Sequence, residues 1–241
     1  MEKPKMVKSL FRKYFLILIL ITVSPILLRA QPVDQQLWSE IRLGGKWNDR
    51  NQWQALVSHR FIIGSVAWNQ YIGRFKWDHR LPKGQVVLAE LALFHTTLKG
   101  FTSVTEVRPW QGYQVTWPKW GSVEVGHLFR LEERFFFQKG MTSSLDLRGR
   151  YQEKWNFILW NDPKKGWKIR LPVSGEVFLN LDGEIFPVLK NRYRFGTGLD
   201  VHYNESWQWG LIAYYQNSRS PIADSDAVGE QLFQAYVKYF L

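Results

Sequence analysis

Arginine and glutamate recur at every second position in several parts of this 241-residue chain, and this spacing is where its chemistry lies. In residues 128–140, LFRLEERFFFQKG, charged residues alternate with phenylalanine and leucine. Because successive side chains of a β-strand point to opposite faces, Arg130, Glu132 and Arg134 share one face and leave the other apolar. Such a row can form ion pairs with a neighbouring strand, and a surplus of arginine can attract an anion.

The same alternation predicts shared charged faces elsewhere. They are formed by Glu106 with Arg108; by Asp146, Arg148, Arg150, Gln152 and Lys154; by Lys168 with Arg170, followed by Glu176; and by Arg192 with Arg194. What these rows do depends on the elements that carry them and on what the other face of each element meets.

Segments of period two run from one end of the chain to the other, separated by clusters of Gly, Pro, Asn and Asp that suit chain reversals. There are eleven such segments: about 36–47, 51–62, 66–79, 85–97, 102–117, 120–136, 142–159, 167–180, 191–203, 206–217 and 230–241. No stretch has the 3.6-residue period of an amphipathic helix, and no linker or low-complexity tract interrupts the series. We therefore expect one all-β domain.

The segments are longer than the strands of an average soluble sandwich, but their length suits a membrane barrel. All 13 Trp residues follow residue 30, and membrane proteins place indoles at both headgroup interfaces. No apolar run after residue 30 is long enough for a transmembrane helix, which leaves the closed barrel as the membrane structure. We predict a single antiparallel transmembrane β-barrel of 10–12 strands.

The strand number is expected to be even, because bacterial barrels made of one chain normally have an even number. Eleven segments then mean that one strand is missed or split, so the specific prediction is ten or twelve. The regions 141–160 and 167–191 are the places where we expect the difference.

Residues 1–30 have the features of a secretory signal peptide. The basic start consists of Lys3, Lys5, Lys8, Arg12 and Lys13. An apolar run at 15–28 follows, and the small residue Ala30 marks the expected cleavage point. Fourteen residues are fewer than the about 20 that span a bilayer as a helix, although an uncleaved N-terminal anchor is the alternative. We expect cleavage after Ala30 and a barrel formed by residues 31–241, exported to the outer membrane of a Gram-negative bacterium.

Charge and cysteine content exclude several classes of function. The net charge of +11 falls to +6 when the seven charged residues of the first thirty are removed. The remaining basic residues are spread along the chain rather than clustered, so nucleic acid is not an expected partner. The chain has no cysteine, which excludes disulfides and a cysteine-linked lipid anchor.

The last segment, QLFQAYVKYFL, is the clearest two-sided strand. One face carries Phe233, Ala235, Val237, Tyr239 and Leu241, and the other carries Gln234, Tyr236 and Lys238. This pattern resembles the C-terminal signal of outer-membrane barrels, which predicts two partners: membrane lipids and the barrel-assembly machinery. The alternative is an amphipathic edge strand of a soluble periplasmic barrel.

If one face of each strand meets lipid, the charged face lines the lumen. Charges in a narrow lumen need partners, so we expect a cross-strand ladder of roughly alternating sign. Glu133 breaks the pattern because it shares a face with Phe129, Leu131 and Phe135. It is therefore expected near the membrane edge, unless a β-bulge moves it to the other face.

A series of short motifs resembles the outer-membrane β-barrel family catalogued as domain of unknown function 2490. The motifs are EVRPWQ (106–111), HLFRLEERF (127–135), RGR (148–150), EVFLNL (176–181), NRYRFGTGLDV (191–201) and YYQ (214–216). The resemblance implies an outer-membrane barrel without an established activity. It also implies a lumen charge network, which comprises Glu106, Arg108, Gln111, Arg130, Glu132, Arg134, Arg148, Arg150, Glu176, Asn191 and Arg192.

Three functions remain open at this point. The network can simply fill and brace a narrow barrel. Excess arginine can instead make the lumen a small, porin-like channel for anionic solutes. The third possibility is an outer-membrane hydrolase acting on lipid or lipopolysaccharide, for which His59, His79, His95, His127 and His202 are available. Because no GxSxG, HExxH or paired metal-ligand motif occurs, we expect neither a catalytic site nor a cofactor or metal.

Overall fold

Polar and apolar residues alternate along each segment, so successive segments gain most by pairing into a sheet whose two faces differ. The computed structural model describes residues 34–63, 68–181, 192–218 and 228–241. These residues form β1 (Asp34–Lys46), β2 (Asn51–Ile63), β3 (Trp68–Arg80), β4 (Gln85–Leu98), β5 (Val104–Thr116), β6 (Val123–Gln138), β7 (Ser144–Asp162), β8 (Trp167–Asn180), β9 (Arg192–Tyr203), β10 (Trp207–Ser218) and β11 (Val228–Phe240). Each predicted segment corresponds to one strand, with ends within three residues of those expected.

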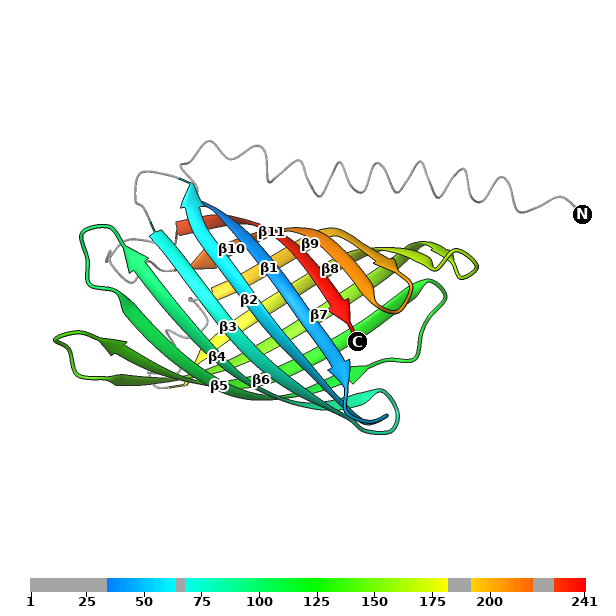
Figure 1. Cartoon of the computed structure of the whole chain (residues 1–241), viewed down its shortest axis with the longest axis horizontal. Helices are drawn as coiled ribbons and strands as arrows, with labels where there is room; N and C mark the ends of the chain where they lie inside the picture. Colours follow the sequence, from blue (N-terminus) through cyan, green and yellow to red (C-terminus); the bar gives the residue numbers. More distant parts are fainter. Residues whose placement is uncertain (1–33, 64–67, 182–191, 219–227) are drawn as a thin grey trace, which may run out of the picture. The chain divides into compact units, whose positions relative to one another are not determined.

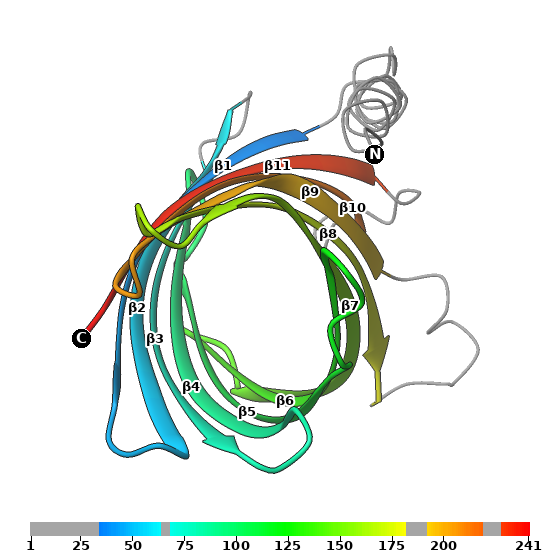
Figure 2. The ribbon, with the colours of Figure 1, turned by 90° about the vertical axis from the view of Figure 1, so that its right-hand side faces the viewer.

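The strands pair in chain order, and β1 then pairs with β11 to close a barrel (Figure 1). Figure 2 looks along this barrel, with the strands forming its wall. Closure gives every strand two neighbours, so no sheet edge leaves backbone groups unpaired in a membrane.

The β1–β11 pair is parallel, and its register runs from Asp34↔Glu230 to Gly44↔Phe240. The prediction of an antiparallel barrel therefore holds for ten pairs of neighbours and is wrong at this seam. The reason is the count of eleven strands in the described residues: when an odd number of strands alternate in direction, the first and last run the same way. Eleven lies within the predicted range of 10–12, but the even number that we expected is not found.

One parity rule describes the two faces of the whole barrel. Residues pair even with even and odd with odd in every ladder, up to a bulge in β7. Every residue that lines the central cavity has an even number, so even positions face inward and odd positions outward. The bulge between Ile158 and Trp160 shifts the register at the end of β7 without splitting this strand of 19 residues.

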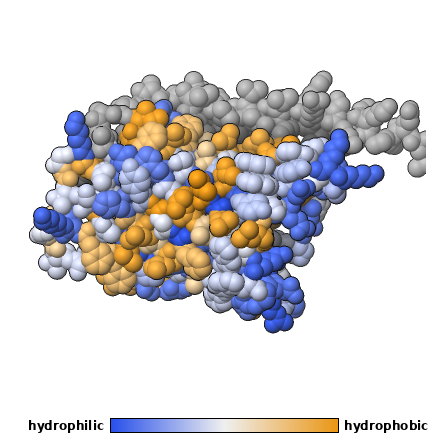
Figure 3. Space-filling model, in the orientation of Figure 1, coloured by the Kyte–Doolittle hydropathy of each residue, from blue (hydrophilic) through white to orange (hydrophobic). Residues whose placement is uncertain are grey.

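The outward face exposes large apolar side chains on all sides of the barrel, among them Ile41 (67% exposed), Leu91 (56%), Phe195 (58%) and Leu211 (65%). In Figure 3 apolar residues gather over the middle of one face, and hydrophilic residues lie mainly toward the two ends. Such a continuous apolar surface is unfavourable in water and favourable against lipid chains. No helix in the described part of the chain is long and apolar enough to cross a membrane.

The two rims of the barrel differ. The C-terminal rim, where β11 ends, carries short connections at 47–50, 81–84, 117–122, 163–166 and 204–206. The N-terminal rim, where β1 begins, carries the connections 64–67, 99–103, 139–143, 181–191 and 219–227, two of which are much longer. Outward-facing indoles gather toward the C-terminal rim, where Trp53, Trp77, Trp167, Trp207 and Trp209 lie within three residues of a strand end.

The tight turns of the C-terminal rim use the residues that the sequence predicted for chain reversals. In the PKG turn, Lys83 (φ 59°) and Gly84 (φ 72°) both have left-handed backbones. The Gly84 carbonyl accepts a hydrogen bond from the Thr116 amide at 2.9 Å, and a Cβ at Gly84 would lie 2.6 Å from the Thr116 carbonyl oxygen. Glycine is therefore required here both for its backbone angle and for this close approach.

Candidate functional site

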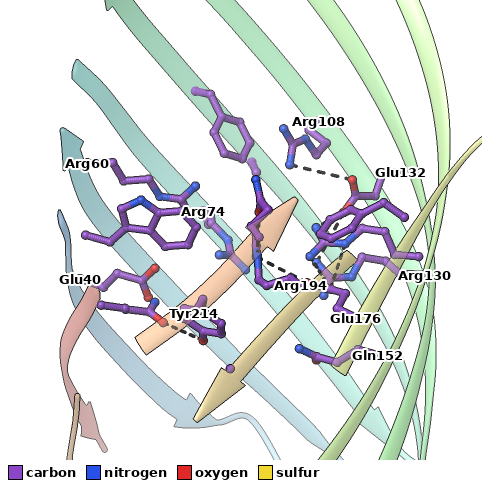
Figure 4. A pocket seen from close by; sticks show the side chains of 18 of the residues that line it. Glu40, Arg60, Arg74, Arg108, Arg130, Glu132, Gln152, Glu176, Arg194 and Tyr214 are labelled. Carbon is purple, nitrogen blue, oxygen red and sulfur yellow. Dashed lines mark hydrogen bonds and ion pairs between the residues drawn. The ribbon is translucent and has the colours of Figure 1, made fainter. Parts of the chain in front are cut away.

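A cavity of about 490 Å³ occupies the lumen, and all eleven strands contribute to its wall. Because the wall is built from even-numbered positions only, the alternation seen in the sequence delivers the charged rows to one common space. Figure 4 shows Arg60, Arg74, Arg108, Arg130 and Arg194 directed into this space from five strands.

Glu132 of β6 is the centre of the largest ion-pair group, which we name the Glu132 cluster: Glu132, Arg108, Arg130, Arg148 and Arg150. Arg148 donates to Glu132 Oε2 from Nε (2.8 Å) and Nη2 (2.5 Å), and Arg150 Nη1 donates to Oε1 at 2.7 Å. Arg130 and Arg108 lie farther away, at 3.5 and 3.9 Å. Glu132 has no exposed surface, so a single buried carboxylate faces four guanidinium groups.

The cluster continues along the wall through shared arginines. Arg108 and Arg134 both contact Glu106, at 2.6 and 2.8 Å, and Arg134 also contacts Asp146 at 2.7 Å. In the other direction, Arg150 Nη2 contacts Glu176 Oε1 at 2.5 Å. Arg194 contacts Glu176 at 3.5 Å and donates to Gln216 Oε1. Glu106, Glu132 and Glu176 are therefore each shared by two or more arginines.

Two arginines are held mainly by aromatic rings. The Arg60 guanidinium lies 3.8 Å from the ring centroid of Trp38, and no carboxylate of the described residues lies within 4.0 Å of it. The Arg130 guanidinium lies 4.4 Å from the Trp110 centroid. The Nε atoms of both arginines are buried without a hydrogen-bond partner. Cation–π contacts orient these groups without neutralising their charge.

A second buried carboxylate, Asp200 of β9, has a different environment. We name Asp200 and the residues that contact it, Arg170, His202, Gln208 and Tyr236, the Asp200 cluster. Arg170 Nη2 donates to its Oδ2 at 2.7 Å, and the Tyr236 hydroxyl donates to Oδ1 at 2.6 Å. Gln208 Nε2 donates to both oxygens at 2.8 and 3.0 Å, and His202 Nε2 lies 3.5 Å from Oδ2. Neutral donors thus supply most of the contacts of Asp200.

Glycine makes the Asp200 cluster possible. A Cβ at Gly210 would lie 2.2 Å from Cε1 of Tyr236, the cross-strand partner of Gly210. The Tyr236 ring therefore occupies the space that a side chain at position 210 would fill, and from there its hydroxyl reaches Asp200.

The cavity wall as a whole carries a surplus of positive charge. Its ten basic residues are Arg42, Arg60, Arg74, Arg108, Arg130, Arg134, Arg148, Arg150, Lys154 and Arg194. Its six acidic residues are Glu40, Glu90, Glu106, Glu132, Glu176 and Glu230. The space therefore has a net positive wall whatever the pairing of individual side chains.

Most residues expected in the lumen network lie there and contact one another. They are Glu106, Arg108, Arg130, Glu132, Arg134, Arg148, Arg150 and Glu176. Gln111 does not: it is exposed on the outer face, where Nε2 donates to Glu133 Oε1 at 3.3 Å. Asn191 and the side chain of Arg192 lie outside the described residues.

The expected ladder of alternating sign is present only in part, since Asp34 lies opposite Glu230 and Arg42 lies opposite Lys238 at the β1–β11 seam. Glu132 lies opposite Arg148, and Arg134 lies opposite Asp146. Arg130, however, lies directly opposite Arg150, so two like charges meet between β6 and β7. Glu132 lies within 3.5 Å of both guanidinium groups, and its negative charge stabilises this pair. Both arginines belong to the surplus of positive charge in the lumen.

Several lumen residues were not singled out from the sequence, among them Trp38, Glu40, Arg60, Arg74 and Glu90. They occupy even positions of β1 to β4, where the charged residues stand farther apart among apolar ones. In LVSHRF (56–61), for example, Arg60 is the only charged residue. If the rule that even-numbered residues of β6 face inward had been applied to the preceding strands, it would have identified them. No sequence pattern groups the members of the Asp200 cluster, because they come from four different strands.

Glu133 stays on the outer face. The β6–β7 register is continuous at Glu133↔Leu147, so no bulge moves it inward. It lies five residues before the end of β6 at the N-terminal rim, and its carboxylate accepts the hydrogen bond from Gln111. At outward positions of the described strands before the β7 bulge, the only other charged residue is Glu153.

The histidines do not form a recognisable hydrolytic site. His59, His79, His95 and His127 take outward positions, and His202 takes a lumen position. Two histidines contact a hydroxyl group as a base contacts a nucleophile: His95 Nδ1 lies 3.1 Å from Thr105 Oγ1, and His127 Nδ1 lies 2.9 Å from the Tyr151 hydroxyl. Among the described residues no carboxylate contacts His95 or His127, and no group of three potential ligands could hold a metal ion.

Comparison with known proteins shows which structures and which family this chain resembles. The chain is similar to the solved structure titled "NanC porin structure in rhombohedral crystal form", with 10% identity, a TM-score of 0.50, and coverage of 87% of this chain and 100% of that one. It is also matched to the translocator domain of the autotransporter NalP from Neisseria meningitidis, with 14% identity, a TM-score of 0.42, and coverage of 88% and 92%. At these identities, the first likeness supports the barrel fold alone.

No curated protein matches the chain. A family model, by contrast, matches residues 35–226, from the start of β1 to just before β11. This range contains the Glu132 cluster and Asp200, and it covers most of the sequence. The chain therefore belongs to the family described as Protein of unknown function (DUF2490).

Proposed function

We propose that this protein is an integral barrel of the bacterial outer membrane, with the C-terminal rim toward the periplasm. The apolar outer face and the closed backbone support a membrane location. The short turns at the C-terminal rim support the orientation, because outer-membrane barrels have short periplasmic turns and longer outer loops. The lipid contacts and the recognition of β11 by the assembly machinery follow from this location.

Within that membrane the protein acts as a narrow channel for small anionic solutes. The observation that carries this proposal is the surplus of positive charge on the wall of an internal cavity, ten basic against six acidic residues. In a low-dielectric barrel, such a wall attracts anions and repels cations, as rings of Arg or Lys do in anion pores. Arg60 and Arg130 contribute most clearly, because rings rather than close carboxylates hold them.

A bracing scaffold is the second candidate, and the complete burial of Glu132 and Asp200 favours it. A scaffold, however, gains stability only when its charges are balanced, since each unpaired buried charge is costly. A surplus of four cations around a cavity is unfavourable for bracing alone and useful for attracting an anion.

Reconstitution into planar lipid bilayers tests the channel. With a KCl gradient across the bilayer, the reversal potential should show that chloride permeates better than potassium. Replacing Arg60 and Arg130 with glutamine should at least halve the permeability ratio, because each change removes a lumen charge and the only ion pair that is lost is the contact of 3.5 Å between Arg130 and Glu132. Absence of single-channel current from correctly folded protein would contradict the channel and favour the scaffold.

Lys164→Gln is the matched control, because it removes one positive charge from the exposed turn between β7 and β8. Salt screens a charge at that position, so selectivity should stay close to that of the native protein. An equal loss of selectivity in this variant would show that the net charge of the whole protein, rather than the lumen wall, controls permeation.

Hydrolysis of lipid or lipopolysaccharide is the alternative activity, and the contacts of His95 with Thr105 and of His127 with Tyr151 favour it. Incubating the purified barrel with lipopolysaccharide and phospholipid tests it by mass spectrometry of released fatty acids. Release that is abolished by His95→Ala or His127→Ala would support an enzyme; no release is the expected result.

A further inference from the structure

A groove of about 710 Å³ crosses the outer face of the barrel over the parallel seam. Its floor is formed by β11 and β1, and its sides by β9 and β10 on one flank and β2 and β3 on the other. The groove opens on the outer face of the barrel, and Glu40 and Tyr236, which also line the lumen cavity, form part of its wall.

One row of paired residues explains the depth of the groove. Following the register across six strands, the outward residues are Leu199, Leu211, Ala235, Ser39, His59 and Tyr71. Two small side chains thus lie side by side at the seam, between two large ones on each flank. A barrel surface is normally convex, but this sequence of sizes leaves a hollow in the apolar face.

The lining is apolar along most of its length and polar at one end. Ile41, Val57 and Leu211 remain 60–67% exposed along the hollow. Toward the N-terminal rim, the His59 ring stacks on Tyr71 with centroids 4.7 Å apart, and His59 Nε2 donates to Asn69 Oδ1 at 3.2 Å. Toward the C-terminal rim, the lining ends at Val201 and Trp209.

We propose that this groove binds one acyl chain of a membrane lipid, with the lipid headgroup beside Tyr71 and Asn69 at the N-terminal rim. The groove belongs to the same apolar surface as the rest of the outer face, so lipid chains are the molecules that meet it in a membrane. Its volume lies within the range of about 300–1,000 Å³ typical of small-molecule sites. A flexible chain in a concave site contacts protein on three sides, whereas a chain on a convex wall contacts it on one.

The single polar end fixes the direction in which the lipid lies. An acyl chain carries its polar ester and phosphate at one end only. The hydrogen-bonding side chains of His59 and Tyr71 line one end of the groove, whereas the other end has only the indole N–H of Trp209 among apolar groups. A second copy of this barrel is a poorer occupant, because its own convex apolar wall would fill the hollow incompletely and leave the polar end unused.

Photo-crosslinking tests the proposal in vesicles of phosphatidylethanolamine and phosphatidylglycerol. The probe is phosphatidylethanolamine with a diazirine in the middle of one acyl chain, and adducts are located by peptide mass spectrometry. Peptides that contain Ile41 and Val237 should carry at least threefold more adduct than the peptide that contains Phe129 and Leu131 on the opposite wall. Equal labelling of both walls in the native protein would overturn the proposal.

A pair of matched variants makes the test specific. Ala235→Trp fills the hollow with an indole and should reduce labelling of the seam to the level of the opposite wall. Ala89→Trp adds the same indole to the outward face of β4 and should leave the ratio unchanged. Unchanged seam labelling in Ala235→Trp would contradict the site. Both substitutions point into lipid, and the native-protein ratio stands as an independent test if either variant folds poorly.

A second probe with the diazirine in the headgroup tests the orientation. It should label the peptide that contains Asn69 and Tyr71 in preference to the one that contains Val201. The reverse preference would overturn the assignment of the headgroup to the N-terminal rim.

Discussion

Two carboxylates, Glu132 and Asp200, have no exposed surface inside this barrel, yet they are satisfied in opposite ways. Glu132 is surrounded by four arginines, each of which is shared with other groups or left partly unpaired. Asp200 has one close arginine and takes its remaining close hydrogen bonds from the neutral donors Tyr236 and Gln208. The first cluster therefore carries a net positive charge, whereas the second is close to neutral.

The difference indicates a division of labour within the lumen. A nearly neutral cluster around a fully hydrogen-bonded carboxylate ties β8, β9, β10 and β11 together next to the parallel seam, where it can serve as a brace. The Glu132 cluster has more cations than bracing needs, and its surplus is available to an anion. The following variants separate these two roles, in order of decreasing effect on stability.

Glu132→Gln should cause the largest loss of stability. Removing the shared carboxylate leaves four nearby arginines without it, and breaking a buried ion pair typically costs about 3–5 kcal/mol. The free energy of unfolding, measured by guanidinium titration of the barrel in lipid vesicles, should fall by about that amount. Asp146→Asn is the control, because Asp146 is partly exposed and contacts only Arg134, so about 1 kcal/mol or less is expected. Equal stability of the two variants would show that lumen water already solvates the arginines.

Gly210→Ala should have the next largest effect. The new methyl group would occupy the place of the Tyr236 ring and push it away from Asp200. Overpacking of this kind costs about 1–3 kcal/mol, and the same titration measures it. Gly73→Ala is the matched control, since a Cβ at Gly73 meets no atom within 4 Å. A neutral effect of Gly210→Ala would mean that the ring position does not matter to the brace.

Tyr236→Phe should have a smaller effect, about 1 kcal/mol, because it removes one hydrogen bond to Asp200 and keeps the ring over Gly210. Anion selectivity should not change, since the substitution removes no charge from the lumen and keeps the ring that the Arg42 guanidinium packs against at 4.0 Å. A marked change in selectivity with native stability would reverse the roles that we assign to the two clusters.

Arg60→Gln should change stability least, by less than about 1 kcal/mol. The lost cation–π contact with Trp38, worth about 0.5–2 kcal/mol, is offset by the removal of a desolvated charge. The same variant should reduce anion selectivity. Arg60→Gln should therefore affect conduction more than stability, whereas Glu132→Gln should affect stability more than conduction. A large loss of stability would place Arg60 in the brace instead.

Much of the fold was predictable, because lumen-facing and lipid-facing residues must alternate along every strand of a membrane barrel. The eleven segments, their ends and the inward and outward faces of β6 and β11 follow from period-two alternation and turn residues. The expectation of an even strand number was wrong because it came from the usual strand number of other barrels rather than from this sequence. Counting the segments directly was more accurate than correcting the count.

The candidate site was predictable in its composition but not in all its members. Strict alternation from Glu106 and Arg108 continues to Trp110, so Gln111 belongs on the outer face, where it bonds Glu133. It was included through family resemblance rather than through parity. The brace of Asp200 and Tyr236 could not be foreseen, because no spacing in the sequence links residues 36 positions apart on β9 and β11.

The sequence by itself determined that the chain forms long, two-faced strands and which side chains share a face, because side-chain direction alternates locally along a strand. Only the tertiary structure decided which charges meet, that β1 joins β11 in parallel, and that Ser39 lies beside Ala235 to form a groove. These features depend on register and closure, which bring together residues from distant strands. The alternation that places a side chain inside the barrel does not choose its neighbour.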